Sequence, residues 1–266
     1  MANSISNLAV INPNARIGND VTIGPFCVIH GDVEIGDGCE LHNNVTIYDG
    51  ARIGKHCKLF PGSVISAVPQ DLKFENEVTI AQIGDHTTIR ECVTINRGTK
   101  ALGKTVVGSN NLLMAYVHVA HDCIVGNHCI LANLVTLAGH ITIDDYAIIG
   151  GISAVHQFVH IGSHVMISGG SLVRKDVPPY TMSAHEPLSY IGINAVGLRR
   201  RGYTNDDITS IHNIYRIVFE EKHTSKKAIE LINTNLPESK FRSEIVKFIS
   251  DSQRGIMKGY AGEDND

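Results

Sequence analysis

The 266-residue sequence contains no Trp, and aromatic residues make up only 6% of it. The bulky rings that anchor many cores are therefore scarce, so a core has to be built mainly from aliphatic side chains. No apolar run approaches the roughly 20 residues that a membrane-spanning helix needs, which argues against stable membrane insertion. The first residues, MANSISNLAVINPN, lack the basic and apolar regions of a signal peptide, so we expect a cytoplasmic protein.

An excess of positive charge is also missing. The formal net charge is −4, which provides no overall attraction to nucleic acid or to an anionic membrane. In contrast, the chain has 25 Gly and 14 His. Many glycines with few large anchors are typical of a chain built from tight turns and short repeats, so we searched for an internal period first.

A six-residue period runs through most of the chain. From Ile5 to Val173, every sixth residue is Ile, Leu or Val except at three positions, and we call the members of this series the hexad residues. Gly often follows a hexad residue, and the fourth residue after it is usually small or β-branched. This is the hexapeptide repeat of a parallel β-helix, in which three hexads form one triangular coil of about 18 residues. The hexad residues are predicted to stack inside it.

The cysteines follow the same period. Five of the six occupy the inward position four residues after a hexad residue: Cys27, Cys39, Cys57, Cys123 and Cys129. The paired CxxC spacing of a zinc site or a disulfide framework is absent. We interpret these cysteines as small buried apolar residues, and we expect no metal and no cofactor.

The period is interrupted twice. Asp71 and Glu77 occupy hexad positions in one interval and Ala101 in another, which predicts loops extruded from the coil at about 66–82 and 98–106. The second loop contains GTKALGKT (98–105), which matches the phosphate-binding pattern G-x-x-x-x-G-K-[ST]. Such a loop must open a helix, yet the repeat resumes at Val107, so we reject nucleotide hydrolysis. Lys100 and Lys104 are expected beside a cleft or against an acidic partner.

The repeat ends near RKDVPPY, where Pro178-Pro179 is expected to break the coil. We predict a β-helical domain over 1–190, then a bridging segment and a helical domain over 191–266. Thr204 and Asp207 have the spacing of a helix-capping pair, and helices are expected from there and near 224–234 and 238–252. The acidic end AGEDND is expected to be frayed.

Residues one coil apart should be vertical neighbours, about 4.8 Å from each other. In HVAHDC, His121 then stacks on Gly139 and next on Gln157, while Asp122 lies under His140 and His118 lies half a strand away. A neutral imidazole can accept a hydroxyl proton, a carboxylate can orient it, and a glycine lets a backbone N–H approach an oxyanion. This constellation suits acyl transfer to a hydroxyl, directly from a thioester. Two alternatives stay open: Asp122 as a turn residue, and His118, His121 and His140 around zinc, as in a carbonic-anhydrase-like hydratase.

Longer motifs carry a family resemblance that spans essentially the whole chain. They are IGPFC (23–27), QDLKF (70–74), IRECVTINRGT (89–99), GSNNLLM (108–114), HVAHDCIVGN (118–127), LAGH (137–140), AIIGGISAVHQF (147–158), DVPPY (176–180) and GLRRRGY (197–203). With them the chain resembles the bacterial UDP-N-acetylglucosamine O-acyltransferases, which catalyse the first step of lipid A biosynthesis. The resemblance implies a left-handed β-helix, a homotrimer with sites between neighbouring β-helices, and transfer of a 3-hydroxyacyl chain from acyl carrier protein.

The resemblance also implies roles for individual residues. His121 is expected to be the general base, Asp122 its partner and Gly139 the oxyanion-hole residue, with His118 and His140 beside the substrate. The further substrate contacts that it implies are Gln70, Asp71, Lys73, His156, Gln157, Asn194, Arg200 and Arg201, with Gly169 leaving room for a long acyl chain.

The chain departs from the family pattern at SAHEPL (183–188), at Val196 and at Asn96, all on the expected nucleotide side. An alternative within the same pathway is the later N-acyltransferase, whose family carries an extra amino-terminal uridine-binding domain. Because the hexads begin at Ile5, we expect the O-acyltransferase.

Overall fold

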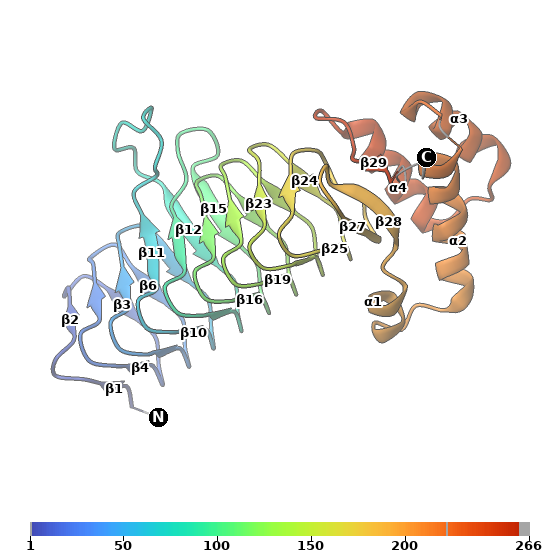
Figure 1. Cartoon of the computed structure of the whole chain (residues 1–266). Coiled ribbons are helices and arrows are strands. Elements are labelled where there is room, and N and C mark those ends of the chain that lie inside the picture. Colours follow the sequence, from blue (N-terminus) through green and yellow to red (C-terminus); the bar gives the residue numbers. More distant parts are fainter. Residues whose placement is uncertain (1, 222, 261–266) are drawn as a thin grey trace.

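The computed structural model describes residues 2–221 and 223–260, so the acidic end AGEDND lies outside the described residues. The chain winds repeatedly through three parallel sheets, which we name A, B and C, and it stacks one coil on the next along a single axis (Figure 1). Strand partners in neighbouring coils lie three hexads apart along the chain, as Ser4 and Thr22 do in sheet A. The predicted mainly β fold, a parallel β-helix with carboxy-terminal helices, is confirmed.

The three sheets consist of very short strands. Sheet A contains β1 (Ser4–Ile5), β4 (Thr22–Ile23), β7 (Glu40–Leu41), β10 (Lys58–Leu59), β13 (Thr88–Ile89), β16 (Leu112–Leu113), β19 (Ile130–Leu131), β22 (Ile148–Ile149) and β25 (Met166–Ile167). Sheet B contains β2 (Val10–Ile11), β5 (Val28–Ile29), β8 (Thr46–Ile47), β11 (Val64–Ala67), β14 (Thr94–Asn96), β17 (His118–Val119), β20 (Thr136–Leu137), β23 (Ala154–Val155) and β26 (Leu172–Val173). Sheet C contains β3 (Arg16–Ile17), β6 (Glu34–Ile35), β9 (Ala51–Ile53), β12 (Ile80–Ile83), β15 (Lys104–Val107), β18 (Ile124–Val125), β21 (Thr142–Ile143) and β24 (His160–Ile161).

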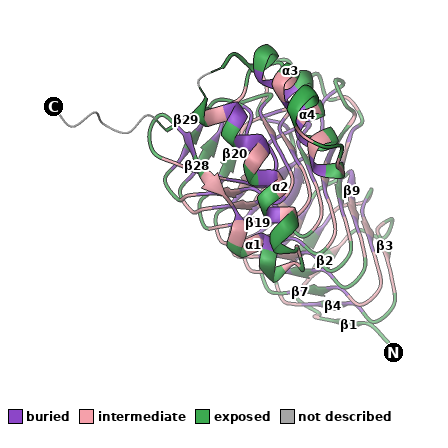
Figure 2. Cartoon of the chain, turned by 90° about the vertical axis from the view of Figure 1, so that its right-hand side faces the viewer, coloured by how far each residue is buried: buried purple, intermediate pink, exposed green. Residues whose placement is uncertain are grey.

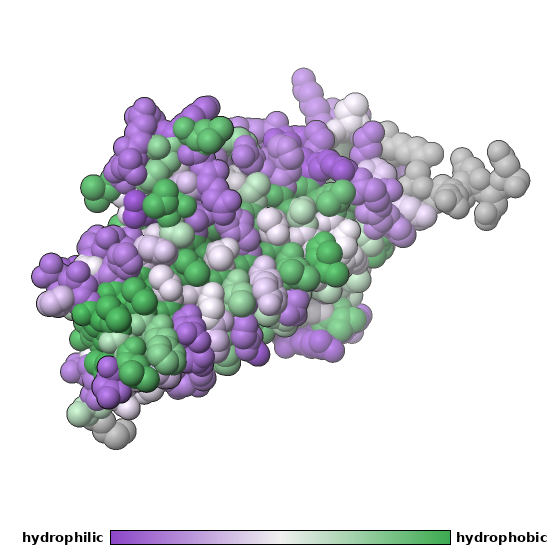
Figure 3. All heavy atoms as spheres, turned by 60° about the vertical axis from the view of Figure 1, so that its left-hand side comes forward, coloured by the Kyte–Doolittle hydropathy of each residue, from purple (hydrophilic) through white to green (hydrophobic). Residues whose placement is uncertain are grey.

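The hexad residues form the core of the β-helix. From Ile23 to Val173 the aliphatic hexad residues are buried, and the five repeat cysteines are fully buried beside them as free thiols. The first coil is different, because no coil of the described residues lies below it: Ile5 is 45% exposed, and Ile11 and Ile17 are only partly buried. Figure 3 shows apolar surface at this amino-terminal end of the molecule.

Two loops leave the coil between sheet B and sheet C. Val64 pairs with Thr94 and Thr94 with His118, so these partners lie five and four hexads apart instead of three. The insertions therefore equal two hexads and one hexad, as the polar positions 71, 77 and 101 indicate. Both loops are shorter than expected, 68–79 and 97–103, because β11, β12 and β15 extend into the predicted loop ranges. Figure 1 shows them projecting from one side of the β-helix.

The prediction that Pro178-Pro179 breaks the coil is wrong. Val177 bridges Ile161, and β27 (Thr181–Ala184) continues sheet A in parallel with β25. Met166 pairs with Met182 in this last turn, so the chain makes the coil two residues shorter than three hexads and passes the prolines at a corner. Strand β28 (Ser189–Ile193) then turns back antiparallel to β27, across the predicted domain boundary at position 190, and β29 (Lys258–Gly259) pairs with it.

The remaining residues form helices at the carboxy-terminal end of the β-helix: α1 (Ala195–Arg200), α2 (Asn205–Tyr215), the π-helical turn η1 (Arg216–Glu220), α3 (Ser225–Asn235) and α4 (Lys240–Asp251). The predicted capping pair is present, since Thr204 and Asp207 exchange hydrogen bonds at the start of α2. Buried Tyr215 anchors α2 to the coil by donating its hydroxyl to the Pro179 carbonyl at 2.5 Å. Figure 2 shows the exposed outer faces of α2, α3 and α4. Within the described residues, none of the helices has the length and apolar character needed to cross a bilayer.

Candidate active site

The predicted catalytic residues lie on one edge of the β-helix, where the chain passes from sheet B to sheet C. We call this edge the B–C corner. At each level the second corner residue has a left-handed backbone, with φ of 59° at Asp122, 61° at His140 and 65° at Phe158. Side chains seldom adopt this conformation, although Asp and His tolerate it better than most residues. The repeat therefore displays chemically active side chains in a vertical column on a rigid edge.

His121 and Asp122 form a hydrogen-bonded pair. The His121 Nδ1 lies 2.8 Å from Asp122 Oδ2, and the two residues are only 7% and 1% exposed. A carboxylate accepts hydrogen bonds, so the His121 Nδ1–H is the donor and the Nε2 is left with its lone pair. Burial alone raises the pKa of Asp122, but hydrogen bonds from His121, Thr99 and Leu102 outweigh it and lower the pKa below its ordinary value. Asp122 is thus a buried carboxylate partner of His121 and does not merely form a turn.

Gly139 lies directly on the His121 ring, as the column predicts. A Cβ at position 139 would come within 2.6 Å of His121 Cε1 and 2.8 Å of Nε2, so only glycine leaves the ring in place. The backbone N–H of Gly139 donates to no acceptor within the described part of the chain. A glycine whose N–H is unused among the described residues therefore packs against the His121 ring.

The two neighbouring histidines have different surroundings. His140 meets the His121 ring edge-on at 5.1 Å between centroids and stacks on Phe158, with its Nε2 3.8 Å from Asp122 Oδ2. His118 shares a hydrogen bond of 2.7 Å with Thr94 through its Nδ1. Burial, and then the proximity of His121, lower the pKa of His118. The lowered pKa favours the neutral ring of His118, and its Nδ1 is already engaged by Thr94.

The GTKALGKT loop supports Asp122 and does not resemble a phosphate cradle. Strand β15 follows it, as expected, and no helix begins there. The Thr99 N–H and the Leu102 N–H donate to Asp122 Oδ1 at 3.0 and 3.2 Å, and the Thr99 hydroxyl donates to Oδ2 at 2.7 Å. The Asp122 N–H in turn donates to the Thr105 hydroxyl at 2.9 Å. The loop thus supplies three of the four hydrogen bonds to the carboxylate.

The first loop is hydrogen-bonded to the second. The Thr79 hydroxyl donates to the Gly98 carbonyl at 2.6 Å, and the Lys100 N–H donates to Glu77. This contact brings the segment that carries Gln70, Asp71 and Lys73 to the same edge as His121. Gln70 and Lys73 are exposed, whereas Asp71 is partly buried and accepts from the Lys73 N–H at 3.0 Å.

The other predicted contacts are spread more widely. His156 and Gln157 continue the B–C corner and are exposed, and Gly169 is exposed at the corner between sheets A and B. Asn194 is buried and caps α1, accepting from the Gly197 N–H and donating to the His164 carbonyl. Arg200 is exposed, and Arg201 lies over the Tyr146 ring at 5.3 Å. Within one chain these α1 residues lie at the corner between sheets C and A, away from His121.

Several residues at the site were missed by sequence reasoning. Thr99 and Leu102 were missed because the one-hexad insertion breaks the rule of vertical neighbours between their coil and that of Asp122. Thr94 was not considered, although it precedes His118 by one coil plus one hexad. The stacking of Phe158 on His140 follows from their spacing of one full coil and could have been found.

The site also offers ligand atoms for a metal ion. One ligand atom from each of His121, Asp122 and His140 falls within 4.8 Å of the others, whereas His118 of the alternative zinc set is not in this group. The Asp122 oxygens already accept four hydrogen bonds, so metal binding would have to displace some of these donors.

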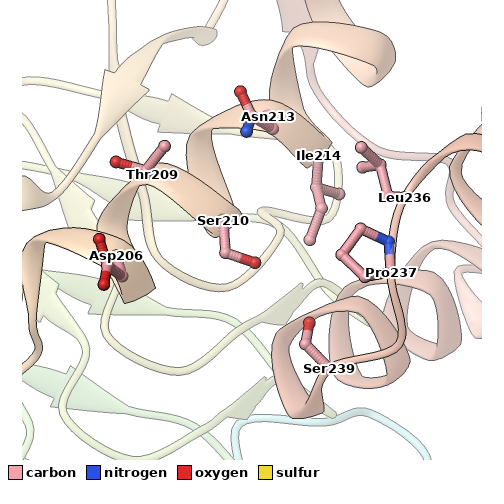
Figure 4. Close-up of a pocket in the computed structure, with 8 residues that line it drawn as sticks. All are labelled: Asp206, Thr209, Ser210, Asn213, Ile214, Leu236, Pro237 and Ser239. Carbon is pink, nitrogen blue, oxygen red and sulfur yellow. The ribbon is translucent and has the colours of Figure 1, made fainter.

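A separate hollow of about 290 Å³ lies in the helical domain, between α2 and the segment that enters α4 (Figure 4). Its polar lining comes from Asp206, Thr209, Ser210, Asn213 and Ser239. No histidine or cysteine lines it, so this hollow lacks the acid–base pair found at the B–C corner.

Comparison with known proteins agrees with this architecture. The family described as bacterial transferase hexapeptide (six repeats) matches residues 14–49, 32–67 and 104–139. The repeats and the histidine–carboxylate corner define a hexapeptide-repeat acyltransferase with a left-handed parallel β-helix. A second family, UDP N-acetylglucosamine O-acyltransferase domain 2, matches residues 176–257.

The relatives identify the family. Acyl-[acyl-carrier-protein]--UDP-N-acetylglucosamine O-acyltransferase of Burkholderia mallei (strain SAVP1) is 40% identical over 195 residues, covering 71% of this chain and 74% of the relative. The crystal structure of the UDP-N-acetylglucosamine acyltransferase from Bacteroides fragilis 9343 matches with 49% identity and a TM-score of 0.94, covering 95% of this chain and 99% of that chain. The Francisella novicida enzyme matches with 42% identity and a TM-score of 0.92, covering 96% and 94%. The chain belongs to the UDP-N-acetylglucosamine O-acyltransferase family.

Proposed function

We propose that this protein transfers a 3-hydroxyacyl chain from acyl carrier protein to the 3-hydroxyl of UDP-N-acetylglucosamine, the first step of lipid A biosynthesis. The observation that carries the proposal is the buried His121–Asp122 pair with the Gly139 backbone against its ring. The named relatives support the choice of substrates, since they are acyl-[acyl-carrier-protein]--UDP-N-acetylglucosamine O-acyltransferases.

The geometry suggests a direct transfer. His121 Nε2 accepts the proton of the sugar hydroxyl. At the same time the hydroxyl oxygen attacks the thioester carbonyl carbon, and a new C–O bond forms. Asp122 holds the imidazole in the required tautomer and stabilises its protonated form. The negative oxygen of the tetrahedral intermediate is placed near the Gly139 N–H. The C–S bond then breaks, and His121 returns the proton to the departing thiolate.

The roles of the binding residues are assigned from the family resemblance. Asp71 and Lys73, on the first loop, are assigned to the sugar and its phosphates, and His118 and His140 to the reacting groups. His156 and Gln157 extend the same edge toward the nucleotide or the acyl chain. Exposed Gly169 leaves space for a long acyl chain. Exposed Lys100 and Lys104 are assigned to the rim facing the acidic carrier protein.

We further propose that the active unit is a homotrimer. His121 lies on the B–C corner, whereas Asn194, Arg200 and Arg201 lie near the corner between sheets C and A. A site that uses both groups therefore needs two chains, with the α1 residues of one facing the B–C corner of the next. In this arrangement Arg200 and Arg201 bind the diphosphate, and buried Asn194 positions α1 by capping it.

The decisive experiment uses purified protein, UDP-N-acetylglucosamine and a ladder of 3-hydroxyacyl carrier-protein thioesters. We expect a product heavier by one hydroxyacyl group, detected by mass spectrometry, and the preferred chain length is read from the same reactions. UDP-3-O-acyl-glucosamine serves as the competing acceptor and separates this activity from the later N-acylation. Absence of product from UDP-N-acetylglucosamine with every donor contradicts the proposal.

The metal-ligand geometry of His121, Asp122 and His140 makes a zinc-dependent hydratase the second candidate. The two candidates differ in metal content. Acyl transfer by His121 is expected to survive exhaustive dialysis against a chelator with zinc below one-tenth equivalent per chain. A hydratase instead requires about one zinc per site and hydrates carbon dioxide without a thioester.

A further inference from the structure

Three of the four defined positions of GTKALGKT, namely Gly98, Gly103 and Thr105, have a structural reason that does not involve phosphate. A Cβ on Gly98 would lie 2.3 Å from the Lys104 backbone nitrogen, and Gly103 has a φ of +71°. Thr105 is fully buried and accepts from the Asp122 N–H. These residues fold the loop tightly against the B–C corner, so that Thr99 reaches the Asp122 carboxylate.

Thr99 acts on the oxygen that matters for catalysis. Asp122 Oδ2 accepts both the His121 Nδ1–H at 2.8 Å and the Thr99 hydroxyl at 2.7 Å. Thr99 is itself 6% exposed, and its N–H donates to the other carboxylate oxygen at 3.0 Å. One residue therefore contacts both oxygens and sets the plane of the carboxylate.

A competing partner makes this constraint necessary. His140 Nε2 lies 3.8 Å from the same Asp122 Oδ2, too far for a hydrogen bond but reachable by a small rotation of the carboxylate. Such a rotation would weaken the hydrogen bond to His121 Nδ1. His121 could then adopt its other tautomer, in which Nε2 carries the proton and cannot act as a base.

We propose that Thr99 is a positioning residue, whose hydroxyl and N–H hold the Asp122 carboxylate toward His121 and away from His140. This role rests on the acyl transfer proposed above. The loop is held in turn by the first loop, because the Thr79 hydroxyl donates to the Gly98 carbonyl and the Gly98 N–H donates to the Ile80 carbonyl. Thr99 is thus connected through Gly98 to the segment that carries Asp71 and Lys73.

The test compares Thr99→Val, which removes the hydroxyl that donates to Asp122 and accepts from the Ala101 N–H, with Thr99→Ser, which keeps it. Hydrogen bonds to charged groups are worth enough to predict a roughly 10-fold fall in kcat for Thr99→Val, with both KM values within about 2-fold. Thr99→Ser is expected to retain most of the activity. Thr88→Val is the matched control, because Thr88 lies in the same coil on sheet A, and its kcat is expected to be unchanged.

The pH profile supplies a readout that a purely structural role would not move. With one donor fewer on the carboxylate, the interacting His121–Asp122 pair takes up its proton at higher pH, so the acidic limb of kcat/KM moves upward in Thr99→Val. His118, His140 and the buried Cys123 thiol are titratable groups close to the pair, and all three are present in every variant.

Folding and function are separated by two further measurements. If Thr99→Val loses its folded circular dichroism signal, the comparison of Thr99→Ala with Thr99→Ser tests instead whether the hydroxyl is needed for activity. Imidazole ¹⁵N shifts, assigned with His121→Ala, report the His121 tautomer without turnover, and we expect the Nδ1–H form in the wild type and a mixture in Thr99→Val. An inactive wild type contradicts the proposed function alone. A full-rate Thr99→Val with an unchanged tautomer, or an equal loss in Thr99→Ser, overturns the positioning role.

Discussion

Two edges of this β-helix stack histidines and aromatic rings at the same corner position, but they differ in chemistry. The B–C corner stacks Asp122, His140 and Phe158, and the corner between sheets C and A stacks His128, Tyr146, His164 and Tyr180. Centroid distances are similar in the two stacks, 4.7 Å from His140 to Phe158 and 4.8 Å from Tyr146 to His164. The coil therefore builds both columns in the same way.

The difference lies in what the histidines touch. His164 has no hydrogen bond to a carboxylate among the described residues: its Nε2 lies 3.0 Å from the Tyr203 hydroxyl, and its buried Nδ1 has no hydrogen bond. Burial, and then the Arg201 cation, lower the pKa of His164 to about 4. The comparison teaches that a stack of rings does not by itself provide a candidate base: His121 lies beside the B–C stack, hydrogen-bonded to the Asp122 carboxylate and with Gly139 against its ring.

The largest expected loss of activity comes from removing the histidine that the two corners do not share, His121. Removing the general base in His121→Ala should lower kcat by roughly 10³- to 10⁴-fold, because proton transfer contributes about that much to such reactions. His128→Ala, on the opposite edge, is the control and should stay within about 2-fold. Steady-state kinetics with mass-detected product measures both. Most of the rate surviving in His121→Ala would show that another group takes the proton.

The next prediction concerns Gly139, the glycine that packs against His121. Gly139→Ala should lower kcat by roughly 10²-fold, because a methyl 2.6 Å from the His121 ring displaces it and crowds the oxyanion position. Gly31→Ala is the matched control at the same corner position, where the atom nearest to the added methyl is the Asn12 side-chain oxygen at 3.2 Å. Equal losses in both variants would mean that the coil, and not the site, requires glycine there.

The third prediction sharpens the contrast through stability. The unfolded chain protonates His164 near its ordinary pKa of 6.5 and the folded protein near 4, so the unfolded state binds more protons between these values. The free energy of unfolding should therefore fall by about 3 kcal/mol as the pH is lowered from 7 to 4 on account of this residue. His164→Phe keeps a stacking ring and should flatten that slope in urea titrations. If the pH dependence of the free energy of unfolding is unchanged in His164→Phe, His164 is not its origin.

The smallest expected change in activity tests whether the corner between sheets C and A binds substrate. Burial lowers the pKa of Arg201, and its Nη1 is buried without a hydrogen bond in the described part of the structure. An anion there would find an unused donor, so Arg201→Gln should raise KM for UDP-N-acetylglucosamine roughly 10-fold and leave kcat within about 2-fold. Exposed Arg199→Gln is the control. An unchanged KM in Arg201→Gln would assign this arginine to packing alone.

Much of the fold could be predicted because the six-residue period is a direct record of side-chain burial. It identified the parallel coil, the inward cysteines and the places of both insertions, whose loops it predicted too long. The period says nothing about α1, β28 or β29, whose positions depend on contacts between distant segments. It also could not show that the coil passes Pro178-Pro179, since shortening a turn by two residues leaves no periodic signal.

The candidate site divides in the same way. His121 and Gly139 lie one full coil apart, so their contact follows from the repeat, and Asp122 adjoins His121 in the sequence. Thr99 belongs to an insertion whose path is not periodic, and only the folded loop shows it beside Asp122. Arg201 was placed by resemblance, and nothing in a single chain brings it to the catalytic corner.

The uncovered first coil has a consequence for how the molecule comes apart. Each coil contacts chiefly the coils above and below it, so the β-helix behaves as a one-dimensional stack whose local stability depends on having two neighbours. Ile5 and Val10 are 45% and 64% exposed, whereas Leu59 and Leu113 are fully buried. Amide hydrogens should therefore exchange fastest at the amino-terminal coil and progressively more slowly toward the catalytic coils, which lie well inside this gradient of protection.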